Sequence, residues 1–184
     1  MEDMRNFKSL PNSYWIASTD TTDYPELQQD IAVDTLIVGG GMVGIITAYL
    51  LNKEGIQTAI LEAGRIAMGT TAHTTAKITS QHGILYDKIK NQRGLDIASQ
   101  YAQANEMAIC EIKNISQACK IECDYLLQAA IVYTQQDKNV EKIEKEIETA
   151  SELGIKASWV DEIPFPITIK GGMKFEDQAQ FHPR

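Results

Sequence analysis

Hydrophobic residues near the start of the chain form alternating strand-like and helix-like stretches. Residues 36–38 are a run of large apolar residues, Leu-Ile-Val, which is typical of a buried parallel strand. An apolar helical stretch covers 42–53 and ends before Gly55, where a helix C-cap glycine is expected. A second apolar run covers 58–61 and ends on an acidic residue. The pattern predicts a strand–helix–strand (βαβ) unit over residues 33–62.

The later part of the chain mixes helical and strand periods. Apolar residues at three- and four-residue steps predict a short helix broken near Gly94, a long helix over 97–119 and a third helix over 137–153. Between the last two helices, 123–134 has the period of β-structure, and we expect two strands joined by a hairpin through Gln128. This half is therefore predicted to be an α+β segment.

The third predicted helix carries many charged residues. Glu141 and Lys145, and likewise Lys142 and Glu146, are four residues apart, which is the spacing of helical ion pairs. We therefore expect both pairs on a solvent-exposed face. Short strands are predicted beyond this helix at 158–160, 167–170 and from Met173 onward.

Three glycines follow the first predicted strand. Gly39, Gly41 and Gly44 have G-x-G-x-x-G spacing. In this motif the first glycine permits a tight turn, the second lets the backbone approach a pyrophosphate, and the third lets the helix lie close to the sheet. The helix N-terminus offers N–H groups and a partial positive charge to the phosphates. Glu62, at the end of the second predicted strand, is placed to accept hydrogen bonds from ribose hydroxyls. We interpret this unit as dinucleotide-binding.

Two other interpretations of this stretch are open. Residues 35–51 carry no charge, and Gly40 and Gly44 have the spacing of a membrane-helix dimer motif, so a membrane span is one of them. Three consecutive glycines within this run and charged residues close to both of its ends disfavour a span. The other interpretation is a glycine-rich turn that binds no ligand.

A polar loop comes directly after Glu62. Residues 63–82 are rich in Thr, Ala and Gly and poor in large apolar residues. Arg65 is suited to pair with a phosphate, and His73 and His82 are candidates either to act near a redox centre or to serve as structural hydrogen-bonding groups. Four threonines are suited to donate hydrogen bonds to a ligand: Thr70, Thr71, Thr74 and Thr75. We favour a ligand-lining role over a flexible surface loop.

The residues before the βαβ unit are predicted to form an arm, 1–32, rich in turn-forming residues. Tyr14, Trp15 and Ile16 are expected to pack onto the body of the protein, because consecutive exposed apolar side chains are unfavourable. The alternative is that Trp15 contacts a substrate.

Composition limits the classes of function. Of the 184 residues, 43% are hydrophobic and 23% are charged, as in an ordinary globular protein. The formal net charge of −8 argues against nucleic acid and anionic membranes as partners. The three cysteines form no C-x-x-C pair and have no metal-site spacing, so no metal site is expected. The N-terminus has no apolar signal segment, and we expect a cytoplasmic protein.

The chain resembles the N-terminal part of the D-amino-acid oxidase-like family of FAD-dependent oxidoreductases, which includes glycine and sarcosine oxidases. Residues 38–44, 61–65 and 68–77 carry this resemblance. More narrowly, 69–83 and 178–183 are similar to bacterial members that have a C-terminal Rieske iron–sulfur domain. The resemblance implies an α/β fold, with a Rossmann-like FAD-binding βαβ unit followed by an α+β segment of a substrate domain. It divides the chain into the arm (1–32), an FAD/NAD(P)-binding Rossmann-like half (33–82) and a helical, partial substrate-domain segment (83–184).

The resemblance also implies FAD as cofactor and an amine or amino acid as substrate, oxidised at its C–N bond by hydride transfer to the flavin. No catalytic residue is assigned. The residues implied to bind FAD are Gly39, Gly40, Gly41, Met42, Gly44, Glu62, Ala63, Arg65, Thr70, Thr71, His73, Thr74 and Thr75.

The chain departs from the family in its length. Family members are longer, and the residues that usually hold the substrate carboxylate lie beyond the position of Arg184, so the chain is expected to be truncated. It contains no Rieske-type Cys-x-His or Cys-x-x-His pair, so no iron–sulfur cluster is expected in it. The alternative function is a catalytically incomplete remnant that folds, self-associates through exposed edges, and binds nucleotide weakly or not at all.

Overall fold

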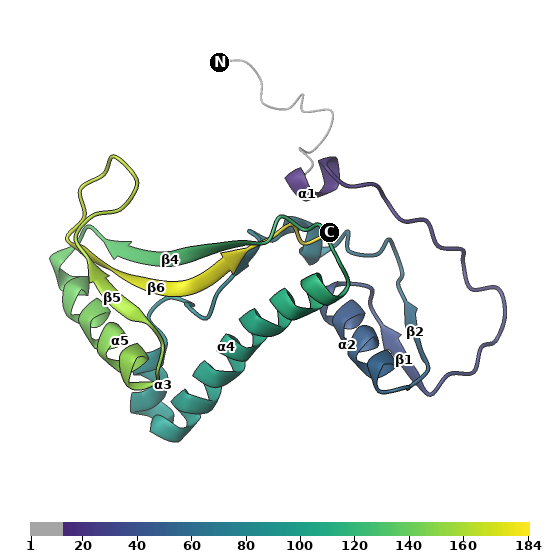
Figure 1. Cartoon of the computed structure of the whole chain (residues 1–184), viewed down its shortest axis with the longest axis horizontal. Coiled ribbons are helices and arrows are strands. Elements are labelled where there is room, and N and C mark those ends of the chain that lie inside the picture. Colours follow the sequence, from purple (N-terminus) through teal and green to yellow (C-terminus); the bar gives the residue numbers. More distant parts are fainter. Residues whose placement is uncertain (1–12) are drawn as a thin grey trace, which may run out of the picture. The chain divides into compact units, whose positions relative to one another are not determined.

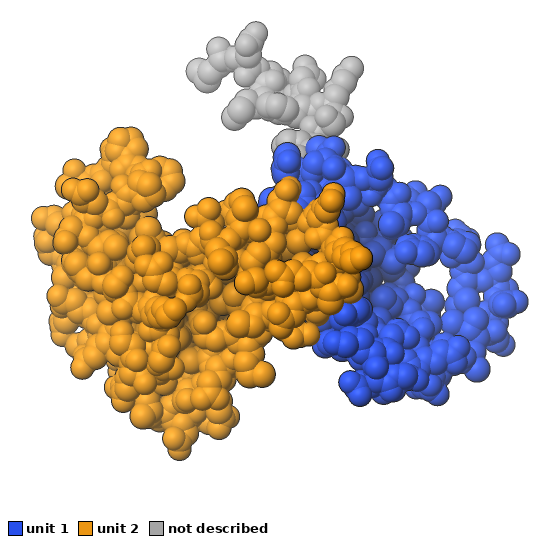
Figure 2. Space-filling model, in the orientation of Figure 1, with its two compact units in different colours: residues 1–75, 182–184 blue, residues 76–181 orange. Residues whose placement is uncertain are grey.

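The computed structural model describes residues 13–184, and the chain divides into two compact units (Figure 2). Unit 1 contains the residues up to Thr75 together with His182–Arg184, and unit 2 contains Ala76–Phe181. Each unit is a set of residues that contact one another more than they contact the rest of the chain. The predicted division into an FAD-binding half (33–82) and a substrate-domain segment (83–184) concerns which ligand each part binds, and it stays a prediction.

Unit 1 contains the predicted βαβ unit (Figure 1). Its elements are α1 (Tyr14–Ala17), β1 (Thr35–Val38), α2 (Met42–Lys53), β2 (Thr58–Leu61) and the 3₁₀ helix η2 (Thr70–His73). Strands β1 and β2 pair in parallel, with Thr35 opposite Thr58 and Val38 opposite Leu61. The strand–helix–strand prediction is confirmed.

Helix α2 ends where the sequence predicts. Gly55 has a φ of 79°, and its N–H donates to the Asn52 carbonyl over 3.0 Å. The N–H of Ile56 donates to the Leu51 carbonyl, also over 3.0 Å. This pair of bonds is a Schellman motif, which needs a residue with positive φ after the helix, and glycine adopts that conformation without a Cβ clash.

Strand β1 is only half covered. Thr35 and Ile37 are partly buried, whereas Leu36 is 50% exposed and Val38 is 84% exposed. The expectation of a buried strand is therefore wrong for the face that carries Leu36 and Val38. The covered face meets α2, since the position of a Cβ on Gly44 would lie 3.3 Å from Ile37 Cγ2.

Unit 2 is an antiparallel sheet with helices. Its elements are β3 (Lys77–Ile78), α3 (Tyr86–Arg93), α4 (Leu95–Ala118), β4 (Leu126–Thr134), η3 (Asp137–Asn139), α5 (Val140–Glu152), β5 (Ala157–Val160) and β6 (Gly171–Gln180). Strand β6 pairs with β4 on one side and with β3 and β5 on the other. Helices α3, α4 and α5 lie on one side of this sheet (Figure 1), where Tyr86, Ile143, Met173 and Phe175 form the centre of the core. The predicted α+β segment is confirmed. Burial raises the pKa of the Tyr86 hydroxyl to about 12.

The hairpin predicted at Gln128 is wrong. Strand β4 is continuous and pairs along its length with β6. Gln128 lies opposite Gln178, but Ala130 lies opposite Phe175, so β6 contains one extra residue at this point. Asp177, which has a φ of 58°, accommodates the extra residue, and the result is a β-bulge in β6. The predicted strand at 167–170 is likewise not a strand in the structure.

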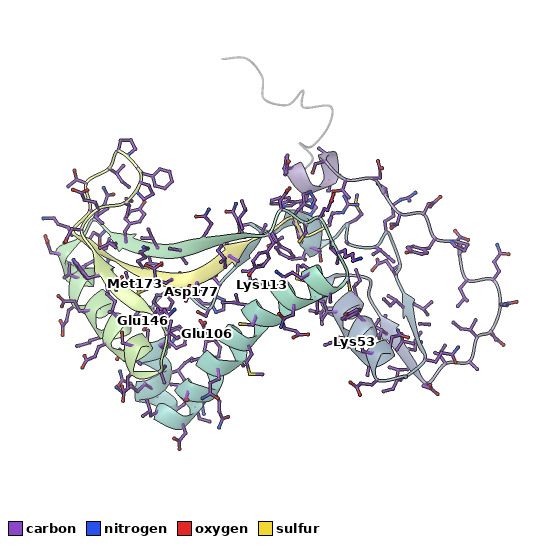
Figure 3. All side chains as sticks on the ribbon, in the orientation of Figure 1. Lys53, Glu106, Lys113, Glu146, Met173 and Asp177 are labelled. Carbon is purple, nitrogen blue, oxygen red and sulfur yellow. The ribbon has the colours of Figure 1, made fainter. Side chains whose placement is uncertain are left out.

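Glu146 is not on the solvent-exposed face of its helix. It is 0% exposed, and its carboxylate accepts backbone N–H groups of Leu85 and Tyr86 over 2.7 Å each and of Asp87 over 2.8 Å. Figure 3 labels Glu146 on α5. The predicted surface pair of Glu146 with Lys142 is wrong. The other predicted pair, which joins Lys145 Nζ to the Glu141 carboxylate over 2.6 Å, is present.

Candidate cofactor site

The turn between β1 and α2 requires two of its glycines for backbone reasons. Gly39 has a φ of 110°, and its N–H donates to the Leu61 carbonyl over 2.8 Å, which joins the turn to β2. A Cβ on Gly44 would lie 2.0 Å from the Gly39 carbonyl oxygen. A side chain at either position would therefore disturb the turn, with or without a ligand.

Gly41 is different, because the protein itself leaves space beside it. Its φ is −83° and its ψ is −177°, which any residue can adopt. A Cβ there would meet only Thr71 Oγ1, at the ordinary contact distance of 3.5 Å. The fold alone therefore does not explain a glycine at this position, whereas close approach of a ligand does.

The first turn of α2 presents backbone N–H groups beside Gly41. The Met42 N–H donates to Thr71 Oγ1 over 3.0 Å, and the Ile45 N–H donates to the Gly41 carbonyl over 3.0 Å. Among residues 13–184 there is no acceptor for the N–H of Gly41 or Val43. These groups and the positive end of the helix dipole are suited to bind an anion such as a pyrophosphate.

Glu62 joins this turn to the end of β2. Its Oε2 accepts the Gly40 N–H over 2.7 Å, and its Oε1 accepts the Gly64 N–H over 2.8 Å. The N–H of Gly40 first, and those of Gly64 and Ala63 after it, hold the pKa of Glu62 below its usual value. The side chain is exposed, and each carboxylate oxygen has a second lone pair. The geometry therefore lets an ionised Glu62 accept ribose hydroxyls.

The threonine-rich loop, residues 63–82, contacts the turn and the start of α2 at two points: the Ala67 N–H donates to the Gly40 carbonyl over 2.9 Å, and Thr71 accepts from Met42. Besides accepting from Met42, Thr71 belongs to η2, in which Ala72 is fully buried. His73 is exposed, and its Nδ1 lies 2.8 Å from the Gly69 carbonyl. Thr70 and Thr75 are exposed, and Thr74 follows η2 directly. The structure thus brings Thr71 to the start of α2 and leaves several neighbouring side chains accessible.

Arg65 contacts the arm. Its Nη1 lies 3.1 Å from Asp23 Oδ1 and donates to the Thr22 carbonyl over 3.4 Å. The Asp23 side chain is 86% exposed, and an exposed pair of this kind contributes little to stability. Cofactor contact by Arg65 stays a prediction.

Sequence reasoning missed the role of Trp15. Its indole Nε1 donates to the Thr74 carbonyl over 2.8 Å, which connects α1 to the threonine-rich loop. Trp15 and Ile16 are partly buried, as predicted, whereas Tyr14 is 67% exposed, so the packing prediction is wrong for Tyr14. The sequence pointed to this contact only through the consecutive apolar residues Tyr14, Trp15 and Ile16, which predict packing but not the hydrogen bond to Thr74.

The described residues contain no group of three or more His, Cys, Asp or Glu side chains that would hold a metal ion. Cys110 and Cys119 are exposed and Cys123 is buried, and none of the three forms a disulfide. The absence of an iron–sulfur cluster stays a prediction. No helix in residues 13–184 combines the length and the apolar character needed to cross a membrane.

Residues 34–184 match the family described as DAO, FAD dependent oxidoreductase. The chain belongs to this family. The resemblance drawn from the glycine turn and the threonine-rich loop is therefore confirmed, together with the predicted fold class of an FAD-dependent oxidase. Since members of this family use FAD, the anion site on α2 and the carboxylate of Glu62 are the features here that fit such a group.

The similar proteins are longer than this chain. The chain is 42% identical to the putative Rieske 2Fe-2S iron-sulfur protein YhfW of Bacillus subtilis (strain 168) over 176 residues, and this alignment covers 96% of this chain and 35% of that protein. It is 27% identical over 150 residues to the gamma-glutamylputrescine oxidoreductase of Escherichia coli (strain K12), covering 79% of this chain and 34% of that protein. The L-amino acid deaminase of Proteus vulgaris has the same fold, with a TM-score of 0.69 at 17% identity over 89% of this chain and 38% of that chain. The chain thus spans about a third of the length of these curated relatives.

Proposed function

We propose that this chain is the N-terminal, FAD-binding portion of an oxidoreductase that oxidises the C–N bond of an amine or amino acid by hydride transfer to the flavin. Membership of the FAD-dependent oxidoreductase family supports the cofactor. One relative is named for gamma-glutamylputrescine, an amine, and this supports the substrate class. FAD supplies the redox chemistry, and the protein contributes binding and orientation.

The observation that carries the proposal is the space at Gly41. A glycine that the fold does not need lies beside N–H groups with no acceptor among the described residues, at the positive end of a helix. In the proposed complex the pyrophosphate approaches the backbone at Gly41, and Glu62 accepts the adenosine ribose hydroxyls. Other residues proposed to line the cofactor are Gly39, Gly40, Met42, Gly44, Ala63, Arg65, Thr70, Thr71, His73, Thr74 and Thr75.

The test is an absorption spectrum followed by an FAD titration. A flavoprotein shows absorption bands at about 375 and 450 nm, which belong to the flavin. Gly41→Ala should fold normally, because the added Cβ meets nothing closer than 3.5 Å, but should bind FAD about tenfold more weakly or worse. Circular dichroism and the thermal midpoint check the fold.

Two results would contradict the proposal. A colourless chain that gains no flavin bands after incubation with FAD would exclude FAD binding by this chain. A Gly41→Ala variant that binds FAD as tightly as the unmodified chain would show that the pyrophosphate site is misplaced.

A second candidate function is a folded module that self-associates and binds nucleotide weakly or not at all. The exposed fractions of Leu36 (50%), Val38 (84%) and Val43 (80%) favour it, because large apolar side chains exposed on a βα unit are suited to association. Light scattering coupled to size exclusion tests this candidate. It requires an oligomer without flavin bands, and Val38→Lys should then convert the oligomer to a monomer.

A further inference from the structure

Trp15 links two segments that are far apart in the sequence. It lies on α1, and its indole N–H donates over 2.8 Å to the carbonyl of Thr74, 59 positions further along the chain. Thr74 is the C-cap residue that directly follows η2, between His73 and Thr75 in the threonine-rich loop. Ordering this donor costs little conformational entropy, because the tryptophan side chain has only two torsions.

The Trp15 ring also has partners of its own. His182 packs edge-on against it, with ring centroids 5.0 Å apart and an interplanar angle of 82°, and the ring centroid of the exposed neighbour Tyr14 lies 5.3 Å from that of Trp15. Arg184 Nη1 donates to the Trp15 carbonyl over 3.2 Å. His182 Nε2 lies 2.9 Å from Ser18 Oγ, at the end of α1. α1 is thus held both to the loop and to residues 182–184.

The two ends of η2 are therefore anchored by different segments. At one end, Thr71 Oγ1 accepts the Met42 N–H at the start of α2 over 3.0 Å. At the other end, the Thr74 carbonyl accepts the Trp15 indole N–H. The side chains proposed to line FAD lie between and beside these anchors, so their positions depend on both.

We propose that Trp15 is a positioning residue for FAD binding: its bond to Thr74 holds the threonine-rich loop in the conformation that receives the cofactor. This inference rests on the proposed function. Because linkage between two binding events is reciprocal, FAD in the site must in turn stabilise the docking of α1 on the loop. α1 therefore reports whether the cofactor site is filled.

The test compares two variants that remove the same chemical group. Trp15→Phe removes the indole N–H and keeps an aromatic ring beside His182. Trp159→Phe is the matched control, because Trp159 Nε1 donates over the same 2.8 Å to Asp161 Oδ1 in unit 2. Loss of one hydrogen bond that holds the loop should weaken FAD binding about two- to tenfold in Trp15→Phe, with no change in Trp159→Phe.

Hydrogen exchange gives a readout that a purely structural role would not change. In the unmodified chain and in Trp159→Phe, adding FAD should slow exchange of the amides of residues 13–19. In Trp15→Phe this protection should be lost, although FAD still protects the first turn of α2. The measurement on the unmodified chain does not depend on whether any variant folds.

The outcomes separate the two proposals. If the unmodified chain binds no FAD, the proposed function fails and this inference fails with it. If it binds FAD but residues 13–19 gain no protection, or if Trp15→Phe binds FAD as tightly as Trp159→Phe, only the role of Trp15 is overturned.

Discussion

Loss of the Glu146 carboxylate should destabilise the chain, because this buried group accepts three backbone N–H groups. Its Oε1 accepts the N–H groups of Leu85 and Tyr86, and its Oε2 accepts that of Asp87, so one buried carboxylate caps the first turn of α3. In Glu146→Gln the amide oxygen can keep the two bonds of Oε1. The amide NH₂ then faces the Asp87 N–H, and because both groups are hydrogen-bond donors, the bond that Oε2 made to Asp87 is lost.

The expected loss follows from this geometry. A hydrogen bond to a charged group contributes about 1.5–3 kcal/mol, so Glu146→Gln should lose about that much free energy of unfolding. Glu146→Ala removes all three bonds and leaves three N–H groups without this acceptor; at about 1–3 kcal/mol for each unsatisfied group, we expect a loss of about 3 kcal/mol or more. A loss of that size is a large fraction of a typical total stability of about 5–15 kcal/mol.

Urea unfolding followed by tryptophan emission measures this loss. Trp159 lies in the same unit as Glu146, and in a Trp15→Phe background it is the sole tryptophan. With a slope of about 1–3 kcal/mol per molar urea, a loss of about 2 kcal/mol moves the midpoint by about 1 M. Glu144→Gln is the matched control, because Glu144 is exposed on the same helix.

One result would refute the reasoning on Glu146. If Glu146→Gln and Glu144→Gln both stay within about 0.5 kcal/mol of the unmodified chain, which is the range of ordinary surface substitutions, the three bonds do not stabilise α3.

Two further predictions concern the glycine turn. Gly44→Ala should lower the thermal midpoint of unfolding even without FAD, because the added Cβ would lie 2.0 Å from the Gly39 carbonyl oxygen. Overpacking of this kind costs about 1–3 kcal/mol or more, and an unchanged midpoint would contradict the close packing. Backbone N–H groups, first that of Gly40, lower the pKa of Glu62 in the folded chain below its usual value of 4.5. The ionised carboxylate therefore stabilises the fold above pH 4.5, and this stabilisation is lost as the pH falls through the folded-state pKa. The midpoint difference between the unmodified chain and Glu62→Gln should therefore shrink on acidification over this range, and a difference independent of pH would count against the bond.

The sequence was sufficient where the physical cause is local. The individual extents of β1, α2 and β2, the end of α2 at Gly55 and the positive φ of Gly39 depend on residues within a few positions of one another. Apolar period, turn chemistry and glycine spacing act over that range, and a contiguous stretch therefore predicts them. The same holds for the long helix α4, whose apolar period predicted its existence.

The predictions that failed depend on partners far along the chain. Gln128 was read as a turn, but pairing with β6 keeps β4 continuous and a bulge at Asp177 takes up the extra residue. Glu146 has the helical spacing of a surface charge, yet its acceptor bonds reach N–H groups about sixty positions earlier. Nothing in the local period distinguishes a carboxylate that meets water from one that caps a neighbouring helix.

The sequence by itself determined the glycine turn, the acid at the end of β2 and the family to which they point. These features are fixed by backbone conformation and spacing within one short stretch. Only the tertiary structure decided that Glu146 is buried and that the indole of Trp15 holds Thr74. Both results require two distant segments to be in contact, and such contacts are set by packing of the whole unit, which no local pattern of residues encodes.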